Sequence, residues 1–304
     1  MSGAWMKVTE VGSVNGLRFV SWLATTFGRG LSSVLLGPIA FYYALVGHRA
    51  RRAMGSYYRR LGTPAGFFTK VRHLRVFAQC ILDRVLLLRG DYSALVIERE
   101  GEEHLQRLRA SRQGAILLGA HLGSFEAMRA SAEVRDFEIY VVGYFKNAEM
   151  VNRVLDAAGN NQGPKLINLA DSSPLNVALQ IKEAIDAGCL VAVLADRTGH
   201  GQDTTVNFLG AEARLPTGPY ALASTIGCPV FLTFGLYESP NRYRLICEPF
   251  AEKVELPRSE RQKAIQGYAQ RYADRLEHYC RLAPDNWFNF FEFWSESDVP
   301  VRHP

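Results

Sequence analysis

The sequence predicts an α/β fold with a mixed, largely parallel central sheet, helices on both faces of the sheet, and a hydrophobic helical segment at the N-terminus. Short apolar runs, including residues 115–118 and 189–194, have the length and composition of buried strands. Stretches with helical periodicity, such as residues 67–88 and 174–187, separate these runs. Residues 30–47 contain no charged side chain, which indicates the hydrophobic helix.

The apolar segment has the dimensions of a membrane helix. As a helix its 18 residues reach about 27 Å, close to the ~30 Å of a bilayer core. A basic cluster follows directly, consisting of His48, Arg49, Arg51, Arg52, Arg59 and Arg60. Such a flank holds the following domain on the cytoplasmic side and suits anionic headgroups. A single-pass helix, a peripheral helix and a buried helix of a soluble domain all stay open.

Charge and cysteine usage restrict the partners. A net charge of +5 and a pI near 9.0 favour an anionic membrane face, a phosphorylated lipid or an acidic carrier protein. The sequence has no recognisable nucleic-acid-binding motif, so we expect no nucleic-acid partner. The five cysteines form no C-x-x-C pair, which argues against disulfides and a zinc site and favours a reducing compartment.

Residues 114–129 place a histidine and a glutamate where a predicted strand ends and a helix begins. Ser124 is suited to cap that helix, and Glu126 falls in its first turn. On one continuous helix, residues five apart lie about 140° apart, so His121 reaches Glu126 only if it sits in the turn before the helix. A carboxylate on one imidazole nitrogen leaves the other free to accept a proton, which would make His121 a general base. The alternative is a structural turn histidine beside a solvated acid.

The strand followed by His121-Leu-Gly-Ser-Phe-Glu126 resembles the H-x-x-x-x-D/E motif of the lysophospholipid acyltransferase superfamily, in particular its lipid A late acyltransferase branch. Further segments of that branch recur in the same order and at similar distances. They are Ala-Asp-Arg at 195–197, Val-Asn-Phe-Leu-Gly at 206–210, Leu-Pro-Thr-Gly-Pro at 215–219 and Thr-Ile-Gly-Cys-Pro-Val at 225–230. The resemblance covers roughly residues 110–235.

The resemblance implies an acyltransferase that moves a fatty acyl chain from an acyl carrier protein or coenzyme A thioester to a hydroxyl or amine of a lipid-like acceptor. It implies no metal, no cofactor beyond the thioester co-substrate, and a location at the cytoplasmic face of a bacterial inner membrane. We divide the chain accordingly into a membrane-associating helical segment, residues 1–60, and a catalytic domain, residues 61–304.

The resemblance also assigns site residues. His121 would accept the proton of the acceptor and Glu126 would orient it. Asp196 and Arg197 follow a predicted strand, where catalytic groups collect in open α/β sheets. The predicted substrate-binding residues are Arg197, Asp196, Lys146, Gly123, Ser124 and Phe208. Three alternatives stay open: a structural Asp196–Arg197 salt bridge, a merely solvated Lys146, and ordinary core packing of Phe208.

Two other functions fit the same residues. In a thioesterase, water would replace the acceptor. In a membrane-bound lipid carrier or assembly component, the motif would remain without turnover. The acceptor itself stays open among a lipid A precursor, a glycerolipid, an amino-acid-linked lipid and the attachment of a polyene or polyketide chain.

Overall fold

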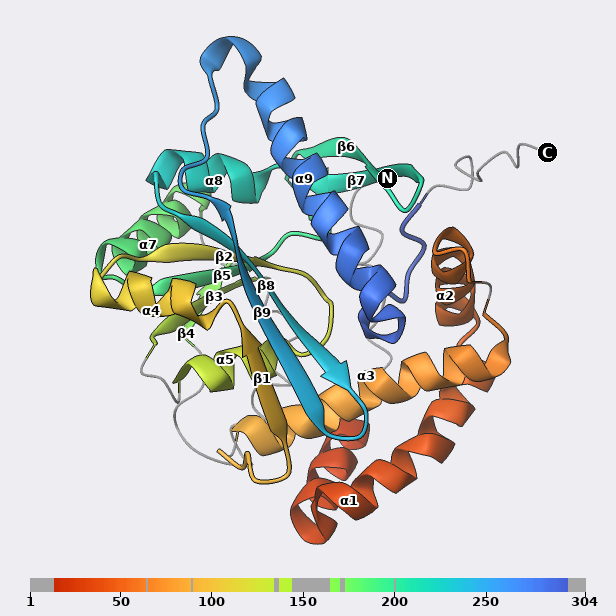
Figure 1. The fold of residues 1–304 in the computed structure, drawn as a ribbon. Coiled ribbons are helices and arrows are strands. Elements are labelled where there is room, and N and C mark those ends of the chain that lie inside the picture. Colours follow the sequence, from red (N-terminus) through yellow and green to blue (C-terminus); the bar gives the residue numbers. More distant parts are fainter. Residues whose placement is uncertain are drawn as a thin grey trace, which may run out of the picture.

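The computed structural model describes residues 14–63, 65–88, 90–133, 137–143, 165–169, 173–199 and 201–294. Figure 1 shows helices packed around one twisted sheet. The N-terminal half contains α1 (Val14–Val46), α2 (His48–Arg60), α3 (Phe67–Leu88), β1 (Val96–Glu100), α4 (Glu102–Ala110), β2 (Ala115–Gly119), α5 (Phe125–Glu133) and β3 (Ile139–Gly143). The C-terminal half contains β4 (Lys165–Asn168), α7 (Pro174–Asp186), β5 (Leu190–Leu194), β6 (Asp203–Phe208), β7 (Ala211–Pro216), α8 (Gly218–Ile226), β8 (Val230–Glu238), β9 (Arg242–Ala251) and α9 (Arg261–Leu282).

The central sheet is mixed and largely parallel, as predicted. Its seven strands lie in the order β1-β9-β8-β2-β5-β3-β4. Only the β8–β9 pair is antiparallel, because a hairpin joins these two strands. All other neighbours in the sheet pair in parallel. Strands β6 and β7 form a separate antiparallel pair.

Helices cover both faces of the sheet because side chains alternate along each buried strand. On β2, Ile116 and Leu118 point into the larger core, which also receives Val177 of α7 and Tyr220 of α8. The intervening Leu117 points to the opposite face, into a smaller core under α4 and α5. Because both faces of this strand are buried, its sequence is a continuous apolar run.

The N-terminal apolar helix is present and is longer than the charge-free segment. Gly28 has φ +69° and ψ 175°, so α1 consists of two helices that meet at this residue. The second part packs along α3, and Leu36 is buried in one cluster with Leu82, Val85 and Leu86 of that helix. Within the described residues, the segment Thr26–Val46 is long and apolar enough to cross a membrane, and only 22% of it is buried.

Helix α2 packs into the larger core of the sheet domain. Its buried Met54, Tyr57 and Tyr58 belong to the same cluster as Ile116 and Leu118 of β2. The basic residues of the predicted flank are therefore carried by a helix whose opposite face is part of the domain core.

Candidate functional site

Two adjacent parallel strands bring His121 and Asp196 together. The register pairs Gly119, the last residue of β2, with Leu194, the last residue of β5. The Ala195 N–H still donates to the Gly119 carbonyl at 3.0 Å, so the ladder continues past both ends. His121 and Asp196 each lie two residues beyond these strand ends and therefore meet above the edge of the sheet.

The Asp196 carboxylate is fully buried and accepts hydrogen bonds from two residues. Its Oδ1 accepts from Nδ1 of His121 at 2.8 Å, and its Oδ2 accepts from the His121 backbone N–H at 3.0 Å. The indole Nε1–H of Trp287 also donates to Oδ2, at 3.2 Å. Burial alone raises the pKa of Asp196, but the charge and hydrogen bonds of His121, together with the charge of Arg197, outweigh burial and hold the pKa at about 2. Asp196 is therefore an anion at neutral pH.

The His121 imidazole is held as a neutral base. Burial and the nearby Arg197 charge lower its pKa below the usual value, against the opposite effect of Asp196. Because the buried carboxylate accepts from Nδ1, the assigned tautomer carries its proton there and leaves a lone pair on Nε2. The side chain is 31% exposed, so a reactant can reach the ring.

The turn that carries His121 is fixed by hydrogen bonds to the C-terminal segment. The Gly123 N–H donates to the Asn286 carbonyl at 2.8 Å, and the Phe288 N–H donates to the His121 carbonyl at 2.8 Å. The Asn286 side chain in turn pairs with both backbone groups of Tyr237 on β8. Residues 286–288 therefore connect the histidine turn, the buried carboxylate and the central sheet.

Gly123 and Ser124 have structural roles in this turn. Gly123 has φ +72°, and a Cβ at this position would lie 1.9 Å from the Gly235 carbonyl oxygen. Only glycine permits such a conformation and such a close approach. The Ser124 Oγ accepts from the Ala127 N–H at 3.1 Å, which confirms the predicted N-terminal cap of α5.

The predicted contact between His121 and Glu126 is wrong. Glu126 is buried in the first turn of α5, where its carboxylate binds Arg129 of the same helix at 2.5 Å and lies 3.5 Å from Nε of Arg84 on α3. Asp196 occupies the position on Nδ1 that was expected for Glu126. The physical reason is that the start of α5 directs Glu126 towards two arginines, while the sheet register delivers Asp196 directly to the imidazole.

Arg197 and Phe208 both contact the C-terminal aromatic segment, residues 287–294. The guanidinium of Arg197 donates to the Phe288 carbonyl at 2.9 Å and lies 5.4 Å from the centre of the Phe291 ring. Phe208 is 1% exposed and stacks on Trp294 with ring centres 5.8 Å apart. Phe208 is thus part of the aromatic core, the alternative considered for it. The predicted Lys146 lies outside the described residues.

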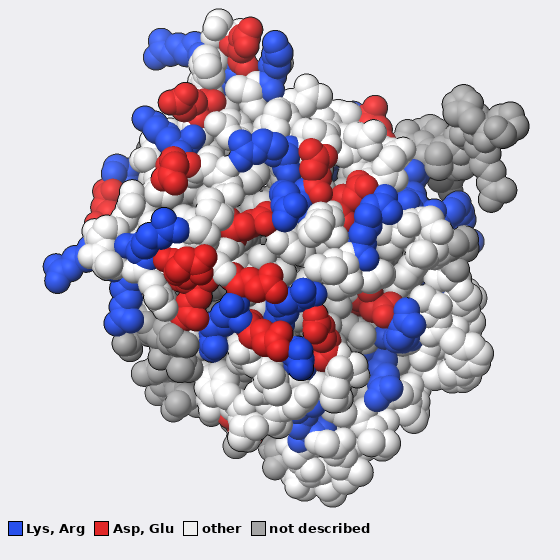
Figure 2. Space-filling model, viewed as in Figure 1, with Lys and Arg blue, Asp and Glu red and all other residues white. Residues whose placement is uncertain are grey.

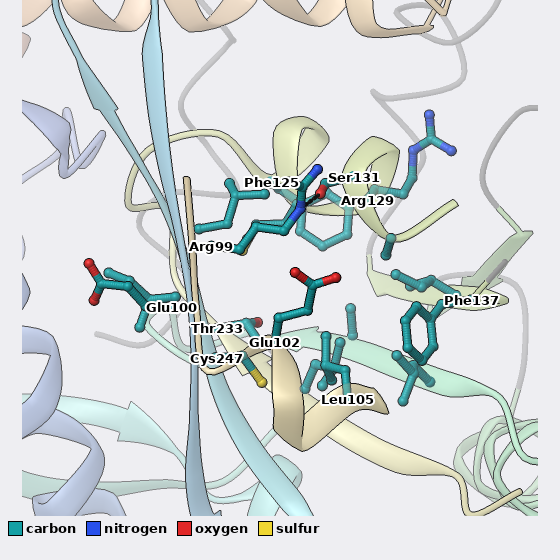
Figure 3. Close-up of a pocket in the computed structure, with 18 residues that line it drawn as sticks. Arg99, Glu100, Glu102, Leu105, Phe125, Arg129, Ser131, Phe137, Thr233 and Cys247 are labelled. Atoms are coloured by element: carbon teal, nitrogen blue, oxygen red, sulfur yellow. Dashed lines mark hydrogen bonds between the residues drawn. The ribbon is translucent and has the colours of Figure 1, made fainter. Parts of the chain in front are cut away.

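An apolar pocket opens on the opposite side of the sheet from the larger core. It is bounded by α4, α5 and the strands beneath them, and Figure 3 shows Phe125, Phe137 and Leu105 around its interior. Arg99 and Glu102 also line the pocket, and Arg99 donates from Nε to the Ser131 hydroxyl at 2.7 Å. None of the predicted site residues that the structure describes lines this pocket.

Asp196 is among the residues predicted for the site, but its contact with His121 and the hydrogen bond that it accepts from Trp287 were not predicted. His121 and Asp196 each lie two residues after the end of a strand, which would have predicted their contact. That prediction requires knowing that β2 and β5 are neighbours in the sheet. Within the part of the chain that the structure describes, no three His, Cys, Asp or Glu side chains form a group able to hold a metal ion.

Comparison with known proteins agrees with the motif. A comparison with curated proteins found no match. The model of the family described as bacterial lipid A biosynthesis acyltransferase matches residues 77–296, more than two thirds of the chain. The matched region contains β2, β5, the histidine turn and the C-terminal segment that closes over it. The chain therefore belongs to the bacterial lipid A biosynthesis acyltransferase family and is an acyltransferase.

Proposed function

We propose that the protein transfers a fatty acyl chain from an acyl carrier protein or coenzyme A thioester to a hydroxyl or amine of a lipid-like acceptor, with His121 as general base and Asp196 as the residue that orients it. The observation that carries the proposal is the 2.8 Å contact between Nδ1 of an accessible imidazole and a buried carboxylate. This arrangement keeps Nε2 free to accept a proton, as general base catalysis requires.

The reaction begins when the acceptor oxygen or nitrogen attacks the thioester carbonyl and its proton passes to Nε2 of His121. The imidazolium that forms lies against the Asp196 anion, which stabilises it. The positive charge of Arg197 lies near enough to lower the pKa of His121, and it favours the negative charge that develops on the carbonyl oxygen.

The tetrahedral intermediate then collapses. The carbon–sulfur bond breaks, and the departing thiolate takes the proton from His121, which returns the imidazole to its neutral form. The acyl chain passes directly to the acceptor, so no covalent acyl-enzyme is needed. We assign Glu126 to the support of this turn, because its pairs with Arg129 and Arg84 fix the start of α5 against α3.

The partners and the location follow from the same proposal. Coenzyme A and acyl carrier protein thioesters occur in the cytosol, while a lipid acceptor resides in a membrane, so the enzyme works at the cytoplasmic face of the bacterial inner membrane. The apolar helix α1 and the arginine-rich helix α2 support this location.

The test is acyl transfer by the purified full-length protein in mild detergent. Isotope-labelled acyl-coenzyme A or acyl carrier protein is supplied with bacterial lipid extract, and products are identified by mass spectrometry. We expect a labelled acyl-lipid with the wild type and at least a 10³-fold slower reaction with His121→Ala. The matched control is His104→Ala, because His104 is a histidine of α4 that also lies beside an acidic residue, Glu103.

Three results would contradict the proposal. Full transfer by His121→Ala would remove the general base. Release of free fatty acid with no dependence on added lipid would identify a thioesterase. Binding of acyl-lipid without any turnover of either thioester would identify a lipid carrier.

A further inference from the structure

Many apolar side chains of α1 are exposed. Counting side chains at least one third exposed, α1 and the start of α3 carry Trp22, Phe27, Leu31, Val34, Leu35, Phe41, Tyr42, Leu45, Val46 and Phe68. Figure 2 shows the same region, at the bottom of the view over α1, as a surface with few charged side chains. An exposed apolar patch of this extent marks an interaction surface.

Both ends of the apolar part of α1 are attached to the same domain. At the N-terminal end, Arg29 makes two hydrogen bonds to the buried Asp83 of α3, at 2.7 and 3.1 Å, and a third to the carbonyl of Pro240 at 2.8 Å. At the C-terminal end, α2 begins after a single residue and buries Met54 and Tyr57 in the domain core.

The middle of α1 also lies against the domain. Ser32, Leu36, Ala40 and Ala44 recur every four residues, and each is at most 2% exposed. Leu36 of this stripe packs in one cluster with Leu82 and Leu86 of α3, whereas the apolar side chains listed above are exposed. A helix fixed at both ends and along one side to a single domain cannot place its ends on opposite sides of a bilayer while that domain stays on one side.

The charge of the helical region identifies the partner. Residues 14–88 contain eleven Lys and Arg but a single acidic residue, Asp83, whereas the whole chain has a net charge of +5. Asp83 is buried and paired, and Arg49, Arg52 and Arg59 are exposed on α2, the helix that follows α1. An apolar helix that is followed directly by a helix with exposed arginines complements an anionic lipid surface.

We infer that α1 binds in the plane of an anionic bilayer and inserts its outward face into one leaflet, so that the protein is held on a single side of the membrane. The inference does not depend on acyl transfer, because it rests on the packing and charge of residues 14–88. It also resolves the choice between a spanning and a peripheral helix in favour of the peripheral one.

The first experiment measures flotation of the full-length protein with vesicles of phosphatidylcholine, with and without 30% phosphatidylglycerol. We expect binding that the anionic lipid strengthens, and a loss on the order of ten-fold in Leu31→Asp/Leu45→Asp. The matched control is Leu175→Asp/Leu179→Asp, which places the same change on two exposed leucines of α7. Failure of the wild type to float, or an equal loss in both variants, would overturn the inference.

The second experiment distinguishes in-plane binding from spanning and does not require the aspartate variants to fold. The five native cysteines are buried, so single cysteines are introduced at the exposed Thr26 and His48, near the two ends of the apolar part of α1. A membrane-impermeant maleimide added outside sealed vesicles labels both positions if α1 lies in the plane. Protection of one position until detergent is added would show a spanning helix and refute the inference.

Discussion

Replacing Asp196 with asparagine tests the proposed dyad most directly. In the wild type, Oδ2 accepts from the His121 backbone N–H and the Trp287 indole, while Oδ1 accepts from Nδ1 of His121. The asparagine oxygen can keep the first two bonds, which turns its amide NH₂ towards Nδ1. That nitrogen must then accept a hydrogen bond, so the proton moves to Nε2 and the base loses its lone pair.

The expected cost follows from this tautomer change. Loss of the carboxylate from a carboxylate–imidazole pair lowers turnover by about 10³- to 10⁴-fold in enzymes with the same arrangement. This corresponds to about 4–5.5 kcal/mol at ~1.36 kcal/mol for each factor of ten. The fold should persist because the two hydrogen bonds that tie the buried side chain to its neighbours are kept.

Glu126→Gln provides the contrast. Removing the charge of Glu126 leaves the buried Arg129 with weaker compensation, so we expect a loss of about 3 kcal/mol in the free energy of unfolding. Turnover of the folded fraction should fall less than ten-fold, since Glu126 does not contact the imidazole. The control is Asp203→Asn, which also replaces a carboxylate by an amide, but in a partly exposed ion pair with Arg214.

The assay combines denaturant unfolding with the rate of acyl-lipid formation, measured by mass spectrometry under conditions where each variant is folded. Full turnover in Asp196→Asn, together with complete loss in folded Glu126→Gln, would refute the argument. It would show that the motif glutamate, and not the sheet-delivered aspartate, controls the histidine.

Three other predictions concern pH and backbone geometry. In the proposed mechanism the neutral His121 is the active form, so the rate should rise with pH and level off below the usual histidine pKa. Arg197→Gln removes a charge that lowers this pKa, so its pH–rate profile should move to higher pH while turnover falls about 10²-fold. Burial lowers the pKa of His73 to about 4, so the unfolded state binds more protons than the folded state between pH 4 and 6.5. Chemical denaturation should therefore show that about 3 kcal/mol of the free energy of unfolding is lost as the pH falls through that window. In His73→Gln the free energy of unfolding should depend less on pH over the same range. Gly123→Ala should lower the free energy of unfolding, measured by thermal unfolding, by more than about 3 kcal/mol, because a backbone oxygen blocks the new Cβ. The control is Gly62→Ala, at φ +77° in open space, which should lose about 1–2 kcal/mol. Equal losses in the two variants would refute the steric argument.

Much of the fold was predictable because its signals are local. The apolar runs before His121 and Asp196 form β2 and β5, and α3 spans Phe67–Leu88 as its periodicity predicts. Ser173 caps α7 through the Asn176 N–H, at 3.3 Å. Such elements depend on neighbours within a few residues, which a single sequence contains.

The partner of His121 was not predictable in the same way, because it lies 75 residues away. The choice between Glu126 and Asp196 depends on which strands are neighbours and on where Arg84 of α3 points. In the sequence, Trp287 is one of several aromatic residues between positions 287 and 294, and nothing distinguishes it from the others. Its donation to Asp196 depends on the path of residues 286–288 back to the sheet. These are properties of chain topology, which local periodicity does not encode.

The return of residues 286–288 to the histidine turn has a consequence for biosynthesis. A nascent polypeptide exposes its apolar and arginine-rich first helices long before the ribosome has made Trp287. If α1 binds lipid as we infer above, the growing chain meets the membrane before the turn of His121 has its final hydrogen-bond partners. The arrangement around His121 is therefore completed only after residues 286–288 have been synthesised, when the first helices have long left the ribosome.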